Sequence, residues 1–301
     1  MARPTVVVTR PEPDASEWAQ QLQLAGWPAL LLPLLEIVLP DRPEHVQRLA
    51  YCRAQWPTYD AVMFVSPQAV RYFFGGMEVR SSVAATTAQT PPIHVHSARC
   101  WAPGPGTARA LLEQGIVPAQ IDSPHPEAGQ FDSEALWRVV GPWLAQRCAE
   151  RRTVLSQGGA PCRVLLVRGD STDHASGEVG AGAGGGAGTG REWLADQCRA
   201  AGAAVEFCVA YERRPAVWSA EQTAQARDSV GQGVWLLSSS EGLPLLRQRL
   251  PGVPWAAATA LVTHPRIAES ARVLGFGHVN IVRPALADVL RGLESSCEPT
   301  D

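Results

Sequence analysis

The sequence predicts an α/β protein built from two similar lobes, each with a parallel sheet, and a cleft between the lobes. Two observations predict this class. Short apolar strands alternate with helices along most of the 301 residues, which is typical of parallel α/β sheets. In addition, the pattern of residues 5–38 returns at residues 163–211. Because sizeable ligands bind in clefts between such lobes, the duplication also predicts where a ligand would bind.

The repeat has three parts, which follow one another in the same order in each half. In the first part, a strand ending in arginine leads to a helix with a Glu-Trp pair and then to a second strand, starting at Val6 and at Val164. In the second part, a strand stops at serine and turns into a helix, at Ser66 and at Ser239. A fainter third part covers residues 107–115 and 266–275.

The elements are expected at regular intervals along the chain. Strands are expected at 5–9, 29–38, 60–66, 93–97, 117–122, 163–168, 203–211, 233–238, 256–262 and 278–282. Helices are expected at 14–25, 43–54, 67–74, 106–114, 132–147, 191–201, 219–230, 240–249, 265–274 and 284–294. Four of the helices end at a glycine, where a left-handed residue is wanted: Gly26, Gly115, Gly202 and Gly275.

Composition narrows the function classes. A net charge of −3 and the lack of a basic stripe argue against nucleic acid as a partner. The longest apolar stretch, 28–35, is too short to cross a bilayer, and the first strand follows Met1 too closely for a signal peptide. Seven scattered cysteines without a CxxC motif suit reduced thiols, so we expect a cytoplasmic protein.

The chain contains no lysine, and every basic residue is arginine. This excludes a Schiff-base lysine, a pyridoxal phosphate anchor and the lysine of a phosphate-binding P-loop. His94 and His96 share a strand face near Cys100, but a third ligand is missing and we interpret them as structural.

Two serine turns are candidate ligand contacts, because each leads from a strand into a helix. Helix N-termini expose free N–H groups and suit carboxylate or phosphate. The alternative is plain N-capping, which serine performs at any helix start. The two turns comprise Ser66, Pro67 and Gln68 in the first half, and Ser239 and Ser240 in the second.

A third turn, at residues 101–109, superficially resembles a dinucleotide fingerprint. Arg109 stands where that fingerprint requires glycine, so we reject a nicotinamide site but keep an anion at the Thr107 end of the helix. Arg10 and Arg168 end equivalent strands. They could clamp carboxylates, or they could pair with the acidic neighbours Glu12 and Asp170.

Tyr211 and the glycine-rich segment 171–190 complete the candidates. A phenol at the end of a strand can donate a proton to a leaving hydroxyl, or it can serve packing alone. The segment 171–190 is predicted to be a flexible loop, interpreted as a tolerated surface expansion rather than a lid. Arg191 follows it at a helix start. Residues 76–92 are a second expected insertion.

Taken in order, these motifs resemble the uroporphyrinogen-III synthase family from residue 5 to about residue 294. The segments that carry the resemblance are VVTRP at 7–11, LPLLEI at 32–37, YDAVMFVSPQAV at 59–70, GPGTA at 104–108, RG at 168–169, GREWL at 190–194, VAY at 209–211 and HPRIA at 264–268. Each motif is weakly specific, whereas the whole set in order is highly specific.

The resemblance implies an enzyme that needs no metal or cofactor. Hydroxymethylbilane would lose its terminal hydroxyl, invert its fourth pyrrole ring through a spiro intermediate and close to uroporphyrinogen III, the precursor of haem and sirohaem. Tyr211 matches the family's favoured acid, and Ser66, Thr107 and Ser239 match positions that line its cleft. The remaining residues expected to bind substrate are Arg10, Pro67, Gln68, Arg168, Arg191, Ser240 and Arg266.

The resemblance also implies a different division of the chain from the one that the repeat suggests. A cut near residue 150 would separate the two copies. The family architecture instead joins two lobes by a two-stranded β linker, here about 32–40 and 207–215. Lobe 1 would then comprise 1–37 and 213–301, and lobe 2 would comprise 38–212.

Two departures from the family pattern matter for the site. The family's short RG-x-GR turn is split by the segment 171–190, which weakens a role for Arg191. Ile267 stands where other members carry a threonine, so no hydroxyl contact is available there.

A second function class stays open at this point. The same duplicated cleft would suit a non-catalytic two-lobed sensor or tetrapyrrole-binding protein, although no output module is visible. For the synthase, hydroxymethylbilane is the expected partner, and a transient contact with hydroxymethylbilane synthase is a further expectation. No nucleic acid or membrane partner is expected, and a monomer is the default.

Overall fold

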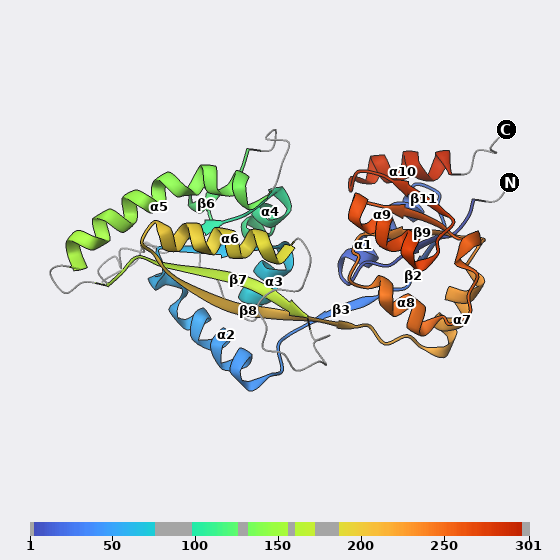
Figure 1. Ribbon diagram of the computed structural model, residues 1–301, viewed down its shortest axis with the longest axis horizontal. Coiled ribbons are helices and arrows are strands. Elements are labelled where there is room, and N and C mark those ends of the chain that lie inside the picture. The colour runs from blue at the N-terminus through green and yellow to red at the C-terminus, as the bar shows by residue number, and fades with distance from the viewer. Residues whose placement is uncertain (1–2, 76–97, 126–131, 156–159, 172–186, 297–301) are drawn as a thin grey trace, which may run out of the picture. The chain divides into compact units, whose positions relative to one another are not determined.

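The computed structural model describes residues 3–75, 98–125, 132–155, 160–171 and 187–296. The expected insertion 76–92 and the expected strand 93–97 with its two histidines lie outside these residues, as do residues 172–186 of the segment 171–190. The chain forms two compact units (Figure 1). Unit 1 comprises Met1–Ile37 and Arg213–Asp301, and unit 2 comprises Val38–Glu212.

Unit 1 contains a five-stranded sheet in the order β11-β10-β9-β1-β2, in which every pairing is parallel. Its strands are β1 (Val6–Val8), β2 (Ala29–Leu31), β9 (Val234–Leu237), β10 (Thr259–Val262) and β11 (His278–Ile281). Its helices are α1 (Asp14–Leu24), α7 (Ala220–Asp228), α8 (Leu243–Arg249), α9 (Pro265–Leu274) and α10 (Leu286–Ser295), with a 3₁₀ turn at Trp255–Ala257.

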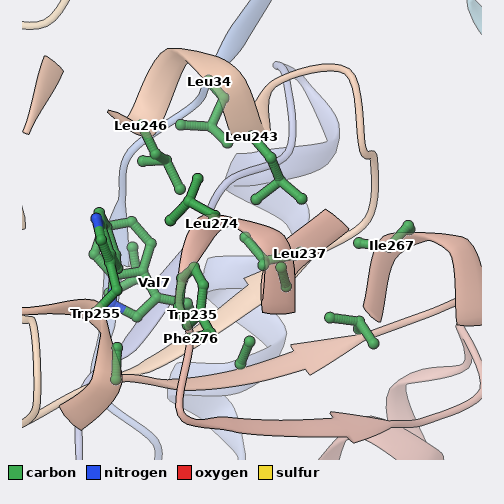
Figure 2. Close-up of a cluster of buried hydrophobic side chains, with 14 of the residues drawn as sticks. Val7, Leu34, Trp235, Leu237, Leu243, Leu246, Trp255, Ile267, Leu274 and Phe276 are labelled. Atoms are coloured by element: carbon green, nitrogen blue, oxygen red, sulfur yellow. The ribbon is translucent and has the colours of Figure 1, made fainter. Parts of the chain in front are cut away.

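The central strands β1 and β9 are buried at every residue, and both read as continuous apolar runs because helices cover both faces of the sheet there, whereas the edge strand β11 is mostly exposed and carries His278 and Asn280. Residues from α8 and α9 pack with Val7 and Trp235 on one face (Figure 2). Residues from α1 and α10 pack with Val6 and Val8 on the other face. Trp235, Trp255 and Phe276 form an aromatic group at one end of the first cluster, with ring centroids 4.8 to 6.3 Å apart.

A six-stranded sheet in the order β3-β8-β7-β4-β5-β6 belongs mainly to unit 2, although residues 35–37 of β3 and 213–215 of β8 fall within the bounds of unit 1. Its strands are β3 (Leu35–Val38), β4 (Ala61–Phe64), β5 (Arg99–Trp101), β6 (Ile121–Asp122), β7 (Arg163–Ser171) and β8 (Ala204–Pro215). Its helices are α2 (Pro43–Gln55), α3 (Pro67–Phe74), α4 (Pro105–Glu113), α5 (Ser133–Leu155) and α6 (Ala187–Ala200), with 3₁₀ turns at Trp56–Thr58 and Pro118–Gln120. Helices α5 and α6 cover one face, and α2 lies on the other (Figure 1).

The expected strand 29–38 is two strands in different sheets, so that prediction is wrong in its extent. β2 pairs with β1, whereas β3 lies next to β8. Pro33 stands between them, and a proline has no N–H group to donate to a sheet. Its carbonyl instead accepts the indole N–H of Trp218 at 2.7 Å.

Several other boundaries differ from expectation. α8 begins at Leu243 rather than at 240, and α5 continues to Leu155 rather than ending at 147. The expected strands 256–262 and 117–122 both begin as 3₁₀ turns, α6 begins at Ala187, inside the expected loop, and β8 continues to Pro215 rather than ending at 211. The four predicted helix-ending glycines all have positive φ, between 79° and 118°. In the part of the chain described here, no helix is both long and apolar enough to cross a membrane.

Candidate active site

The candidate residues of unit 2 gather at the edge of the sheet where its parallel strands end. Ser66 follows β4, the N-terminus of α4 follows β5, and Arg168 lies in the last part of β7. Ligands of parallel α/β sheets bind at this edge. The N-termini of α3 and α4 are neighbours, because a Cβ added at Gly106 would lie 3.6 Å from Pro67 Cγ.

Ser66 connects the start of α3 to Tyr211. Its Oγ accepts the Ala69 N–H at 3.1 Å, which caps the helix as the sequence predicted. The same Oγ lies 3.1 Å from the Tyr211 hydroxyl. A serine hydroxyl has one hydrogen and two lone pairs, so Ser66 can accept from Ala69 and donate to Tyr211 at once. Capping and contact with a functional group are therefore combined in one residue.

Tyr211 is 3 % exposed and lies directly over Gly169 of β7. A Cβ added at Gly169 would come within 2.2 Å of Tyr211 Cε2 and within 2.8 Å of its hydroxyl oxygen. The ring of Tyr72 lies 5.8 Å from the Tyr211 ring, centroid to centroid. Gly169 and Tyr72 were not among the predicted site residues, and only the RG motif at 168–169 pointed toward the first.

Gln68 and Thr107 are both buried at the two helix N-termini, at 9 % and 4 % exposure. The Gln68 Oε1 has no hydrogen-bond partner within the described residues. Such an acceptor is costly to leave unpaired in a protein interior. The paired helix ends supply free N–H groups and positive potential beside it, which favours negatively charged ligand groups.

The two strand-end arginines lie against aromatic rings. The Arg10 guanidinium lies 4.5 Å from the Trp18 ring centroid, and that of Arg168 lies 5.3 Å from the Phe207 centroid. The Nε of each is buried without a hydrogen-bond partner among the described residues. Burial lowers the pKa of Arg10, and this effect is opposed by the charge of Asp14.

The sequence offered acidic neighbours as partners for both arginines, and for Arg10 the structure shows what the neighbour Glu12 does instead. Glu12 accepts hydrogen bonds from the Ser16 backbone at 3.2 Å and from the Ser16 hydroxyl at 3.0 Å. Its carboxylate therefore serves the start of α1 rather than Arg10, which leaves the Arg10 Nε for another acceptor.

The second serine turn is not equivalent to the first, so the expected likeness of the two is wrong in its detail. Ser239 Oγ accepts the Glu241 N–H at 3.2 Å, and α8 begins only after Gly242. Neither Ser239 nor Ser240 is at the helix N-terminus. The two copies are therefore similar in sequence up to the serine, but the backbone after the serine differs, because a helix follows Ser66 directly and follows Ser239 only after a turn.

Arg266 lies in the first turn of α9, where its N–H donates to His264 Nδ1 at 3.1 Å. Ile267 is 5 % exposed and belongs to the core. The backbone of Arg191 lies within α6, but its side chain is outside the described part of the structure. The His, Cys, Asp and Glu side chains that the structure describes form no group of three suited to a metal ion.

The fold and this site define a class of protein: a duplicated parallel α/β protein with a phenol, a hydroxyl and two helix N-termini at one sheet edge. That combination suits acid-assisted chemistry on a substrate that carries carboxylates. The family model of uroporphyrinogen-III synthase HemD matches residues 16–174, which is more than half of the chain. The chain belongs to this family.

Solved structures are similar along nearly the whole chain. Uroporphyrinogen-III synthetase from Helicobacter pylori matches with a TM-score of 0.51 and 13 % identity, over 98 % of this chain and 99 % of that one. A mutant uroporphyrinogen III synthase from Thermus thermophilus matches with a TM-score of 0.46 and 14 % identity, over 97 % and 98 %. At such identities the Helicobacter match shows a common α/β fold, as predicted.

Family membership confirms the expected activity over the alternative of a sensor. The chain is an enzyme of tetrapyrrole biosynthesis that converts hydroxymethylbilane to uroporphyrinogen III. Which of its residues carry the reaction is a separate question, since the family match assigns none of them.

Proposed function

We propose that Tyr211 is the acid that assists loss of the terminal hydroxyl of hydroxymethylbilane, and that Ser66 holds its phenol in position. The observation that carries this proposal is the 3.1 Å contact between the two hydroxyls at the carboxyl edge of the sheet. The phenol of Tyr211 carries the proton that would be transferred. Ser66 accepts the Ala69 N–H with one lone pair, and its own hydrogen remains free to be donated to the Tyr211 oxygen.

The C–O bond of the hydroxymethyl group breaks while the phenol of Tyr211 gives its proton to the leaving oxygen, so that water departs. The neighbouring pyrrole nitrogen stabilises the resulting cation with its lone pair. Ser66 donates a hydrogen bond to the phenolate that remains. The substituted α-carbon of the fourth pyrrole attacks this cation and gives the spiro intermediate. The bond from that carbon to the methylene bridge of the third pyrrole then breaks, and the bridge bonds to the free α-carbon of the fourth ring. That carbon loses its proton, which restores the Tyr211 phenol, so that the net change is the loss of one water.

Orientation of the bilane is the other part of the task. Its eight acetate and propionate carboxylates need cationic or N–H partners, and left alone the bilane closes without inversion. We assign this binding role in unit 2 to Arg168, Thr107, Pro67, Gln68 and Arg191. In unit 1 we assign it to Arg10, Ser239, Ser240 and Arg266. The neighbouring N-termini of α3 and α4 support it, as do the Nε atoms of Arg10 and Arg168, which have no partner among the residues that the structure describes.

The test uses hydroxymethylbilane made in place by its synthase, followed by oxidation and chromatographic separation of the porphyrin isomers. We expect the type III isomer from the wild-type protein, and type I alone would refute the activity. Tyr211→Phe should lower kcat by about ten- to a thousandfold, the range of a single proton-transfer group. Tyr51→Phe, at a tyrosine 47 % exposed on α2, is the matched control and should leave kcat unchanged.

Two finer proposals concern the setting of the enzyme. A transient contact with hydroxymethylbilane synthase would shorten the time in which the free bilane closes without inversion. The test adds an excess of unlabelled bilane while the synthase makes labelled bilane. If the label still appears undiluted in the uroporphyrinogen, the contact is supported; if the label is fully diluted, the contact is contradicted.

We also propose a cytoplasmic location, supported by the scattered cysteines without a CxxC motif.

A further inference from the structure

A cavity of about 520 Å³ lies at the other edge of the sheet in unit 2, away from Tyr211. Asp60 directly precedes β4 and Arg99 begins β5, whereas Ser66 follows β4. The length of β4, at about 3.3 Å per residue, therefore separates this cavity from the candidate active site. Its lining includes Tyr59, Asp60, Arg99, Trp143, Arg147 and Arg151.

Three arginines face this cavity, and each keeps one terminal nitrogen that no hydrogen bond uses within the described residues. Arg147 donates from Nε to Asp60 at 2.8 Å and from Nη1 to Glu150 at 3.4 Å, which leaves Nη2. Arg151 donates to Asp60 from Nε at 3.1 Å and from Nη2 at 2.9 Å, which leaves Nη1.

The third arginine is held from the side of β6. Arg99 donates to the two carboxylate oxygens of Asp122 from Nε at 2.5 Å and from Nη2, which leaves Nη1. None of the three leftover nitrogens is buried without a partner among the described residues, and the three arginine side chains are 29 to 33 % exposed. They are thus held by carboxylates on one side and open on the other.

The carboxylate at the base of the cavity cannot serve as a cation ligand. The Asp60 side chain is 1 % exposed, and it accepts hydrogen bonds from two arginine side chains and from the Arg163 N–H at 3.0 Å. Its negative charge is used to fix the two guanidinium groups. The groups left for a ligand are N–H donors, with Glu150, half exposed, as the other acid in the lining.

Aromatic side chains complete the wall. Trp143 lies beside Arg99, whose guanidinium carbon is 5.8 Å from the indole centroid, and Tyr59 closes another side. Convergent donors and a few aromatic walls in a cavity of several hundred Å³ are typical of sites for small ligands. We propose that this cavity is a second binding site, separate from the active site, for a small oxyanion of the carboxylate or phosphate class.

The test is calorimetric titration of the whole enzyme with two probes, inorganic phosphate and citrate, each against chloride at matched ionic strength. Saturable 1:1 binding of phosphate alone assigns the phosphate class, and binding of citrate alone assigns the carboxylate class. Binding of both supports an oxyanion site of either class. If neither probe binds, the proposal is overturned.

Variants locate the binding. Arg151→Gln and Arg99→Gln should each weaken binding at least tenfold, whereas Arg109→Gln, at an exposed arginine of α4, should leave it unchanged. Binding that is equal in all three variants would overturn the site. Both cavity variants should still give the type III isomer at the wild-type rate, and loss of that activity in a folded variant would refute a separate site.

A second measurement on the unaltered protein guards against variants that fail to fold. The indole N–H resonance of Trp143, assigned by its absence from the spectrum of Trp143→Phe, should shift with the same saturation curve as the calorimetric heat. A resonance that stays in place while heat is released would put the anion elsewhere and overturn the proposal.

Discussion

At the scale of single residues, the position of Tyr211 depends on what Gly169 lacks. The phenol ring occupies the space that any side chain at 169 would fill, since a Cβ there would lie 2.2 Å from Tyr211 Cε2. The ring is also fixed by Ser66 at its hydroxyl and by Tyr72 beside it. A group held from three sides is pre-organised for proton transfer, and small displacements of such groups reduce rates strongly.

We therefore predict that Gly169→Ala lowers kcat by about tenfold or more, because the methyl group pushes the Tyr211 ring from its place. The overpacking should also lower the free energy of unfolding by about 1 to 3 kcal/mol, measured in urea. The control is the same substitution in a Tyr211→Phe background. If Gly169 acts through the phenol, the activity loss there should be much smaller, and fully additive losses would contradict this role.

Which site residues could be predicted from the sequence follows from how local their geometry is. Ser66, Gln68 and Thr107 stand at strand-to-helix turns, and such turns are encoded in a few consecutive residues. The contact of Gly169 with Tyr211 joins two strands distant in sequence, so no local pattern encodes it. The unused nitrogens of the arginines at the opposite edge depend on long-range pairings in the same way.

At the scale of elements, two similar stretches of sequence fold differently after their serines. Ser66 caps α3 directly, whereas Ser239 closes a turn before α8. The difference lies downstream, where Pro67 starts a helix and Gly242 delays one. The expected strand 29–38 also shows how little a local pattern says about tertiary pairing. Its apolar run predicts a strand, but nothing in the run tells that β2 and β3 belong to different sheets.

The two serines give a matched pair of substitutions. Ser66→Ala should lower the free energy of unfolding by about 1 kcal/mol, since it removes a helix N-cap. Ser239→Ala should change it by less than about 0.5 kcal/mol, because this serine caps no helix. Urea unfolding measures both. Equal losses would show that the two turns are equivalent after all.

Asp60, directly before β4, links this strand to α5 and β7. Its carboxylate accepts hydrogen bonds from the side chains of Arg147 and Arg151 in α5 and from the backbone N–H of Arg163 in β7. Burial alone would raise the pKa of Asp60, but these hydrogen bonds outweigh it and lower the pKa below its ordinary value. The folded state therefore binds this proton less tightly than the unfolded state. The stabilisation is complete above the unfolded pKa and is lost as pH falls through the lower folded pKa.

Asp60→Asn should accordingly destabilise the protein by about 2 kcal/mol at pH 7, as the two arginines lose their buried partner. The gap to wild type should begin to narrow as pH falls through about 4, where the unfolded carboxyl takes up its proton, and should close only below the lower folded pKa, where the folded wild-type carboxyl is neutral as well. Asp196→Asn, at an exposed ion pair on α6, is the control and should have little effect at either pH. A gap independent of pH would contradict the assignment.

At the scale of the whole molecule, the sequence repeat and the folded units divide the chain differently. The first strand of the chain, β1, lies between β2 and β9, so the five-stranded sheet joins both ends of the chain. β4 lies between β5 and β7 in the other sheet. The repeat alone predicts two tandem halves, because similarity between segments contains no information on which copy pairs with which. The resemblance to the family, by contrast, predicts that residues 1–37 belong with 213–301 and that 38–212 form the other unit.

Two fragments distinguish these divisions. Residues 33–216 contain every strand of the six-stranded sheet and its covering helices, so we predict that this fragment unfolds cooperatively in urea, monitored by tryptophan fluorescence. Residues 1–150, the half that the repeat suggests, lack the strands next to β1 and β4, namely β9 and β7. Without them one sheet is reduced to the pair β1-β2, and the other to β4-β5-β6, of which β6 has only two residues. A lone strand pair is marginal in water, and the three-stranded remainder lacks the strands β7 and β8 on its other side. This fragment should show no cooperative transition. The opposite outcome, a cooperative 1–150 and an unfolded 33–216, would mean that the tandem halves are the folding units.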